Sequence, residues 1–160
     1  MGSRAGFRRA KVAAWLEQRR PGVVTEDHFE ELRALVAPVS ENDLRRLLRQ
    51  SGAPLAPLVE GVRQEDFDSL ERSLTALEDE YRRAVEASDR KRAKACRRLV
   101  ISAKDRARWS ASHAKTEERR VAKTEMAEWM LVWLENPPLF SEWARLRRQA
   151  SGRGPCGPAY

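Results

Sequence analysis

Glycine and proline are absent from the longest internal stretch of this chain, residues 62–136. These 75 residues contain neither amino acid, although the whole chain of 160 residues holds eight of each. Glycine and proline interrupt helices more strongly than other residues do, so their absence indicates long helices joined by short turns. The sequence therefore predicts an all-α fold, a helical bundle with short N-terminal helices and long antiparallel helices in its second half.

The sequence also lacks the patterns on which most catalytic and metal sites depend. Its two cysteines, Cys96 and Cys156, form neither a metal-binding spacing nor a disulfide framework. Its two histidines, His28 and His113, have no neighbours that would complete a metal site or activate a nucleophile, and we interpret each as a surface or capping residue. The glycines form no phosphate-binding loop. We therefore predict a protein that is not an enzyme and that uses no metal and no cofactor.

Long apolar runs are missing as well. The longest run, from Trp129 to Leu134, has six residues, whereas a membrane-spanning helix needs about 20. The apolar core of a secretory signal is not found near the N-terminus. Together with the cysteine pattern, these absences lead us to expect a cytoplasmic protein without a membrane span.

Acidic residues are fewer than basic residues, 24 against 31, so the net charge is +7. This balance suits nucleic acid, an anionic lipid surface or an acidic protein as partner, and by itself it does not choose among them. Apolar residues make up 41% of the chain and charged residues 34%. The composition allows a packed core and predicts helices with wide charged faces.

Clear helix signals divide the first third of the chain. A helix over residues 5–19 is expected to stop at Pro21, and Thr25 and Ser40 can each cap the N-terminus of a further helix. Gly52 is expected to end the third helix. The apolar residues assigned to the second and third helices are Phe29, Leu32, Leu35, Val36, Leu44, Leu47 and Leu48.

The sequence changes character after residue 61, where the short helices give way to the stretch without glycine or proline. We predict three parts from this change. They are an N-terminal subdomain of short helices over 1–61, a long-helix bundle over 62–150 that ends in an aromatic corner, and a tail over 151–160. Glycine and proline fill the tail, so we predict that it is disordered.

Two interpretations remain open for residues 64–110. Apolar residues at spacings of three and four follow one helix face, and a straight helix would keep Val85 in phase with Cys96 because eleven residues make about three turns. Ser88 and Asp89 fall on the same face, however, and a tight turn there would give two antiparallel helices instead. The apolar residues of this face are Phe67, Leu70, Leu74, Leu77, Tyr81, Ala84, Val85, Cys96, Leu99, Ala103 and Ala107.

The remainder of the second half has its own helix signals. A second turn is possible over residues 110–113, and Thr116 is expected to cap the helix that follows it. The proline pair Pro137-Pro138 should end that helix, because a residue before proline leaves the helical region. Ser141 is then expected to cap a short last helix.

Basic residues gather in the middle of this half. Between Arg82 and Arg108 the chain has eleven lysines and arginines and three acids. A free strip of such residues would contact phosphate groups, but a chain that folds back near Ser88 could instead pair them with the acids at 78–80. The candidate nucleic-acid-binding residues are Arg82, Arg83, Arg90, Lys94, Arg97, Arg98 and Arg108.

Aromatic residues are concentrated at the end of the bundle, on both sides of the proline pair. Tryptophan and methionine often anchor protein interfaces. This aromatic corner is therefore either the core between the last two helices or, where it is exposed, a surface for a partner. The candidate interaction residues are Trp129, Met130, Trp133, Phe140 and Trp143.

These patterns lead to two hypotheses about function. The first is a non-enzymatic helical interaction module that binds another protein or itself, as a homo-oligomer. The alternative is a nucleic-acid-binding protein that uses the basic helical strip from Arg82 to Arg108. The two differ in their dependence on salt, because contacts with phosphate weaken steeply as the salt concentration rises.

Overall fold

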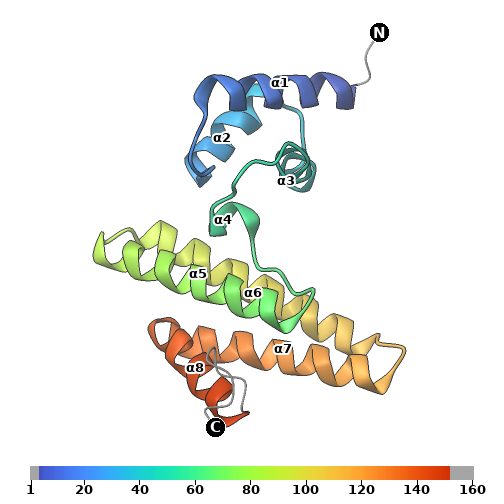
Figure 1. The fold of residues 1–160 in the computed structure, drawn as a ribbon, viewed down its shortest axis with the longest axis vertical. Helices are drawn as coiled ribbons and strands as arrows, with labels where there is room; N and C mark the ends of the chain where they lie inside the picture. The colour runs from blue at the N-terminus through green and yellow to red at the C-terminus, as the bar shows by residue number, and fades with distance from the viewer. Residues whose placement is uncertain (1–3, 152–160) are drawn as a thin grey trace. The chain divides into compact units, whose positions relative to one another are not determined.

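The structure is a computed structural model that describes residues 4–151. These residues form helices and no strand, with one isolated bridge between Val24 and Leu55. This confirms the predicted all-α fold with long antiparallel helices in the second half. Apart from Ser151, the tail predicted to be disordered lies outside the described residues. The elements in Figure 1 are α1 (Arg4–Arg19), α2 (Glu26–Leu35), α3 (Glu41–Gln50), α4 (Pro57–Glu60), α5 (Phe67–Glu86), α6 (Arg90–Ser112), α7 (Glu117–Glu135), the 3-10 helix η1 (Pro137–Leu139) and α8 (Phe140–Ala150).

The chain divides into two compact units between Glu60 and Gly61. In the first unit, α1 to α4 enclose a core made of Val12, Trp15, Val24, Phe29, Leu32, Val36, Leu44, Leu47, Leu48 and Val59. Of the apolar residues assigned to α2 and α3, Leu35 is the exception, because it is 44% exposed. Leu35 is the last residue of α2 and points about 100° away from Val36, which is 3% exposed and faces the core.

Side-chain caps start α2 and α3, as the sequence predicts. The Thr25 hydroxyl accepts a bond from the backbone N–H of His28 at 3.4 Å, and the Ser40 hydroxyl accepts one from Asp43 at 3.2 Å. His28 Nδ1 in turn accepts a bond from the backbone N–H of Thr25 at 3.3 Å. This reciprocal pair is a capping box in which histidine replaces the usual glutamate. His28 is therefore a capping residue.

In the second unit, α5, α6 and α7 lie side by side, and α8 packs against α5 (Figure 1). Long side chains of α5 and α7 fill the core, whereas α6 contributes mainly small ones, which allow neighbouring helices to approach closely. The buried apolar residues of these three helices are Leu70, Leu74, Leu77 and Ala84 of α5, Cys96, Val100, Ala103, Ala107 and Ala111 of α6, and Met126, Ala127, Trp129, Met130 and Trp133 of α7.

The chain reverses between α5 and α6 at Ser88, so residues 64–110 form a hairpin and not one straight helix. Ser88 has a φ of 58°, in the left-handed region. Its N–H donates to the carbonyl of Val85 at 3.0 Å, and the N–H of Asp89 donates to Ala84 at 2.8 Å. These two bonds form a left-handed C-terminal cap of α5, usually made by glycine. Asp89 then caps α6 by accepting a bond from the N–H of Arg92 at 3.1 Å.

The reversal corrects one detail of the predicted apolar face. Val85 is 55% exposed, whereas Cys96, Ala103 and Ala107 are buried. The phase that links Val85 to Cys96 holds only along a straight helix, so after the turn the burial of Cys96 does not depend on that of Val85, which lies in the last turn of α5.

The start of α7 follows its local signals. The Thr116 hydroxyl accepts a bond from the N–H of Arg119 at 3.2 Å, which confirms Thr116 as the N-cap. The helix ends at Glu135, directly before Asn136 and the proline pair, as predicted. The turn between α6 and α7 lies just after Ser112, where α6 ends.

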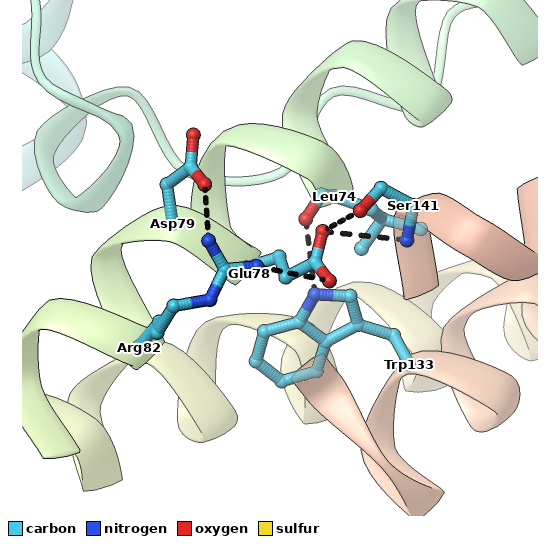
Figure 2. Close-up of polar contacts among 6 residues, drawn as sticks. All are labelled: Leu74, Glu78, Asp79, Arg82, Trp133 and Ser141. Atoms are coloured by element: carbon cyan, nitrogen blue, oxygen red, sulfur yellow. Dashed lines mark hydrogen bonds and ion pairs between the residues drawn. The ribbon is translucent and has the colours of Figure 1, made fainter. Parts of the chain in front are cut away.

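A buried carboxylate joins α5 to the start of α8 (Figure 2). Glu78 is 1% exposed, and its Oε2 accepts hydrogen bonds from the backbone N–H of Ser141, at 3.3 Å, and from the Ser141 hydroxyl. Its Oε1 lies 3.5 Å from the guanidinium of Arg82. Next to it, the indole N–H of Trp133 donates to the carbonyl of Leu74 at 3.0 Å. Two buried polar contacts thus fix α7 and α8 against α5.

These contacts correct the predicted role of Ser141. The N-cap of α8 is Leu139, which makes no side-chain capping bond. Ser141 lies inside the first turn and donates its hydroxyl to Glu78 on another helix. The sequence pattern suggested a local cap, and the partner is instead 63 residues away.

Replacing Ser88 with glycine is expected to stabilise the protein, because the left-handed conformation costs a residue with a Cβ about 1–2 kcal/mol. Glycine is freer in the unfolded chain, which offsets part of this gain, so the free energy of unfolding should rise by about 0.5–1 kcal/mol. Ser88→Val should lower it by about 1–2 kcal/mol, because a β-branched side chain tolerates this conformation poorly. Urea denaturation followed by circular dichroism measures both changes.

Gly52 provides the matched control. It has a φ of 73° at the end of α3, and the N–H groups of Gly52 and Ala53 donate to Arg49 and Leu48, both at 3.0 Å, in the same type of cap. An added Cβ would meet no atom within 4 Å, so Gly52→Ala should lower the free energy of unfolding by about 1 kcal/mol through backbone conformation alone. A loss of stability with Ser88→Gly would contradict this description of the turn.

Glu78→Ala is expected to lower the free energy of unfolding by about 2–3 kcal/mol, because it removes a charged acceptor and leaves both Ser141 donors without their partner. Ser141→Ala should cost only about 1 kcal/mol, since the backbone N–H still binds Glu78. Denaturation measures stability, and hydrogen exchange of the α8 amides reports whether α8 is released. Wild-type protection of α8 in Glu78→Ala would show that the carboxylate does not hold the helix.

Candidate nucleic-acid interface

The outward side of α6 is densely basic. This helix contains nine lysines and arginines and a single acid, Asp105, within 23 residues. Its small apolar side chains, from Cys96 to Ala111, are buried in the bundle. Most of the long basic side chains therefore occupy the rest of the helix surface, where they extend into solvent.

The structure divides the seven predicted residues into two groups. Arg82 pairs with Glu78 and Asp79 at 3.5 and 3.4 Å, and Arg97 donates to the backbone carbonyl of Leu134 at 3.1 Å. The other five are exposed, and within residues 4–151 they form no ion pair: Arg83, Arg90, Lys94, Arg98 and Arg108.

The alternative predicted from the sequence, pairing of the basic residues with the acids at 78–80, also occurs, but it involves only some of the basic residues. Arg92 Nε lies 3.2 Å from Glu80 Oε2, so the fold-back near Ser88 does bring α6 to the acids of α5. Arg82 and Arg92 together engage the three acids at 78–80. These acids consequently do not neutralise the outward side of α6.

Of the six exposed basic residues of α6, five form two adjacent rows, and Arg106 lies outside them. Residues three, four or seven apart share a helix face, which places Arg90, Lys94 and Arg108 in one row and Lys91 and Arg98 in the next. From Arg90 to Arg108 the helix rises about 27 Å, at about 1.5 Å per residue. We refer to these five residues as the basic strip. Acids near it are Asp105, which lies 3.8 Å from Lys104, the exposed N-cap Asp89 directly before Arg90, and the exposed Glu86 at the end of α5.

Sequence reasoning missed Trp109, which lies beside the end of this strip. The side chain is 64% exposed. Its ring stacks on His113 with a centroid separation of 4.1 Å and an interplanar angle of 19°. His113 Nδ1 also lies 2.9 Å from the backbone carbonyl of Trp109. The sequence spacing could have indicated its position. Trp109 follows Arg98 by eleven residues, or about three turns, and therefore lies on the same side of the helix.

An open hollow of about 460 Å³ lies next to the Trp109–His113 pair, at the turn between α6 and α7. Lys115 and Arg119 contribute its basic side chains. Of the nearby acids, Glu118 is exposed, and Glu117 accepts a bond from Arg120 Nε at 2.9 Å. The hydrogen bond from Arg120 holds the pKa of the Glu117 carboxyl below its ordinary value. The hollow thus combines an aromatic wall with two cations.

The aromatic corner proposed as an interaction surface is mostly buried. Trp129, Met130, Trp133 and Phe140 are each at most 6% exposed, and Trp143 is half-buried. The Trp129 ring packs against Trp143 and Phe67, with centroid separations of 5.7 and 5.0 Å. These side chains form the core between α5, α7 and α8, so they offer little surface to a partner.

Other kinds of site find no support in the described part of the chain. Its His, Cys, Asp and Glu residues include no group of three or more that could hold a metal ion. None of its helices is both long and apolar enough to cross a membrane. Cys96 is buried, and Cys156 lies outside the described residues. Comparison with protein families, curated proteins and solved structures finds no match to this chain.

Proposed function

We propose that this protein binds nucleic acid through phosphate contacts made by the basic strip of α6. The observation that carries the proposal is that the five side chains of the basic strip, Arg90, Lys91, Lys94, Arg98 and Arg108, are exposed and form no ion pair among the described residues. Each phosphate neutralised by lysine or arginine releases counterions, so several such contacts give measurable affinity without any contact to a base.

The dimensions of the strip suit a regularly charged polymer. DNA carries a phosphate about every 3.4 Å along each strand, so a strip of about 27 Å would face roughly eight phosphates of one strand. Four residues of α-helix rise about 6 Å, so Arg90, Lys94 and Arg98 would meet about every second phosphate.

An anionic lipid surface matches this helix less well. A basic amphipathic helix binds membranes by inserting its apolar face below the headgroups. The apolar face of α6, including Cys96, Val100 and Ala103, is buried in the folded unit. The strip could therefore attract lipid headgroups only by charge, without the burial that makes such binding stable.

The interaction module predicted from the sequence has weaker support. The side chains assigned to its surface, among them Trp129 and Trp133, are core residues. An acidic protein would match the charge of α6, and it is therefore a competing outcome in the test below. A cytoplasmic location is part of the proposal, because the pattern of only two cysteines, one of them the buried Cys96, suits a reducing compartment.

The variant Arg90→Ala/Lys94→Ala/Arg98→Ala should bind mixed-sequence DNA and RNA more weakly than the wild type. It loses three phosphate contacts, so the slope of log affinity against log salt should decrease in magnitude by roughly 2–3. Fluorescence anisotropy of labelled oligonucleotides over a range of salt concentrations measures both effects. Alanine favours helix, and circular dichroism checks that α6 is retained.

A second triple variant removes the same charge from other helices. Arg46, Arg72 and Arg145 are exposed on α3, α5 and α8, and their replacement by alanine also changes the net charge from +7 to +4, that is 7 − 3. This control should keep most of the affinity. An equal loss in the two variants would contradict the assignment to α6. Binding of polyglutamate in place of nucleic acid would overturn the proposal in favour of an acidic protein partner.

A further inference from the structure

The exposed Trp109 leads to a narrower inference about the ligand, which rests on nucleic-acid binding by the basic strip. We propose that the preferred ligand is single-stranded nucleic acid, with one unpaired base stacked on Trp109 at the α6–α7 turn. Proteins that bind single strands combine a basic surface for the backbone with aromatic side chains on which bases stack. Both components are found on α6.

The position of Trp109 joins it to the basic strip. It follows Arg108 directly and lies about three turns after Arg98, on the same side of the helix. A strand whose phosphates follow Lys94 and Arg98 towards the end of α6 would therefore arrive at the indole. The ring is 64% exposed, unlike Trp15, Trp129 and Trp133, which are buried.

His113 prepares the indole for stacking. The imidazole covers part of the ring at a centroid separation of 4.1 Å, and its contact with the carbonyl of Trp109, at 2.9 Å, ties the two residues together across one helical turn. A side chain already held in one orientation loses less conformational entropy when a ligand binds. The remaining surface of the indole is open to a base.

The hollow beside the ring provides charge for the adjoining backbone. Its volume of about 460 Å³ lies within the roughly 300–1,000 Å³ typical of ligand sites. Lys115 and Arg119 line it and can contact a phosphate next to the stacked base. The acids facing this region are Glu117, which is paired with Arg120, and the exposed Glu118.

A duplex cannot use this platform in the same way. Its bases are stacked on one another and show only their edges in the grooves, whereas a single strand can turn a base face onto an aromatic ring. Phosphate contacts alone favour a duplex, which has the higher charge density. A higher affinity for single strands than for a duplex would therefore indicate that base stacking on Trp109 contributes to binding.

The test compares a single-stranded oligonucleotide with its duplex, using the full chain, Trp109→Ala and Trp109→Phe. Trp109→Ala should weaken single-strand binding about ten- to hundredfold and leave duplex binding unchanged. Trp109→Phe should restore most of the lost affinity, because phenylalanine also stacks. As a second measurement, the single strand should quench the tryptophan fluorescence of the wild type, and this quenching should disappear in Trp109→Phe even though the variant binds.

Phe7 supplies the control substitution, because it is an aromatic residue on α1 that is 60% exposed. Phe7→Ala should bind both oligonucleotides as the wild type does. A loss caused equally by Phe7→Ala and Trp109→Ala would overturn the inference, since any exposed aromatic residue would then have the same effect.

The two proposals fail in different ways. If the wild type binds neither oligonucleotide at low salt, nucleic-acid binding itself is excluded. If it binds both, and Trp109→Ala changes neither affinity or both equally, phosphate binding by α6 stands and the stacking site is overturned. Selective loss of single-strand binding with rescue by phenylalanine supports the site.

Discussion

The reversal of the chain at Ser88 and Asp89 is the constraint on which the second unit depends. The two bonds of the left-handed cap end α5, and Asp89 starts α6 one residue later. Because the connection is short, α6 runs antiparallel to α5. Its small side chains, such as Ala103 and Ala107, are buried in the bundle. The long basic side chains of α6 can then be placed in only two ways. They either reach a partner across the bundle or extend into solvent.

Some basic side chains of α6 bond to other helices of the bundle, and others extend into solvent. The first group stabilises the fold, and the second group can bind a ligand. Arg92 and Arg97 reach Glu80 and the carbonyl of Leu134, and so help to hold α5, α6 and α7 together. On α8, Arg148 pairs with Glu71, and the backbone N–H of Ser141 in the first turn donates a hydrogen bond to Glu78. The α5 acids Glu71, Glu78, Asp79 and Glu80 are engaged in ion pairs of this kind, so they do not neutralise the basic strip. Among the described residues, the unpaired positive charge of α6 is thereby concentrated on its outward face.

Local signals allowed most helix ends to be predicted, because a cap such as Thr25, Ser40 or Thr116 acts within four residues of itself. The position of the hairpin stayed open for a physical reason: Ser88 adopts a conformation that sequence patterns associate with glycine. The role of Ser141 was assigned wrongly because its partner, Glu78, is distant in sequence. For the candidate site, the sequence identified Arg90, Lys94, Arg98 and Arg108, but it could not separate them from Arg82 and Arg97. That separation depends on which neighbour each side chain meets after folding. Trp109 was missed because its exposure is a property of the folded bundle.

Lysine footprinting tests the central claim most directly, because the chain has only six lysines. Two of them, Lys91 and Lys94, lie on the outward side of α6, and Lys115 lines the adjacent hollow. Amine acetylation with and without a bound oligonucleotide, read by mass spectrometry, should show protection of these three residues and unchanged reaction of Lys11 on α1. Protection of Lys11 with full reactivity at Lys91 and Lys94 would show that nucleic acid, if bound, does not use the α6 face.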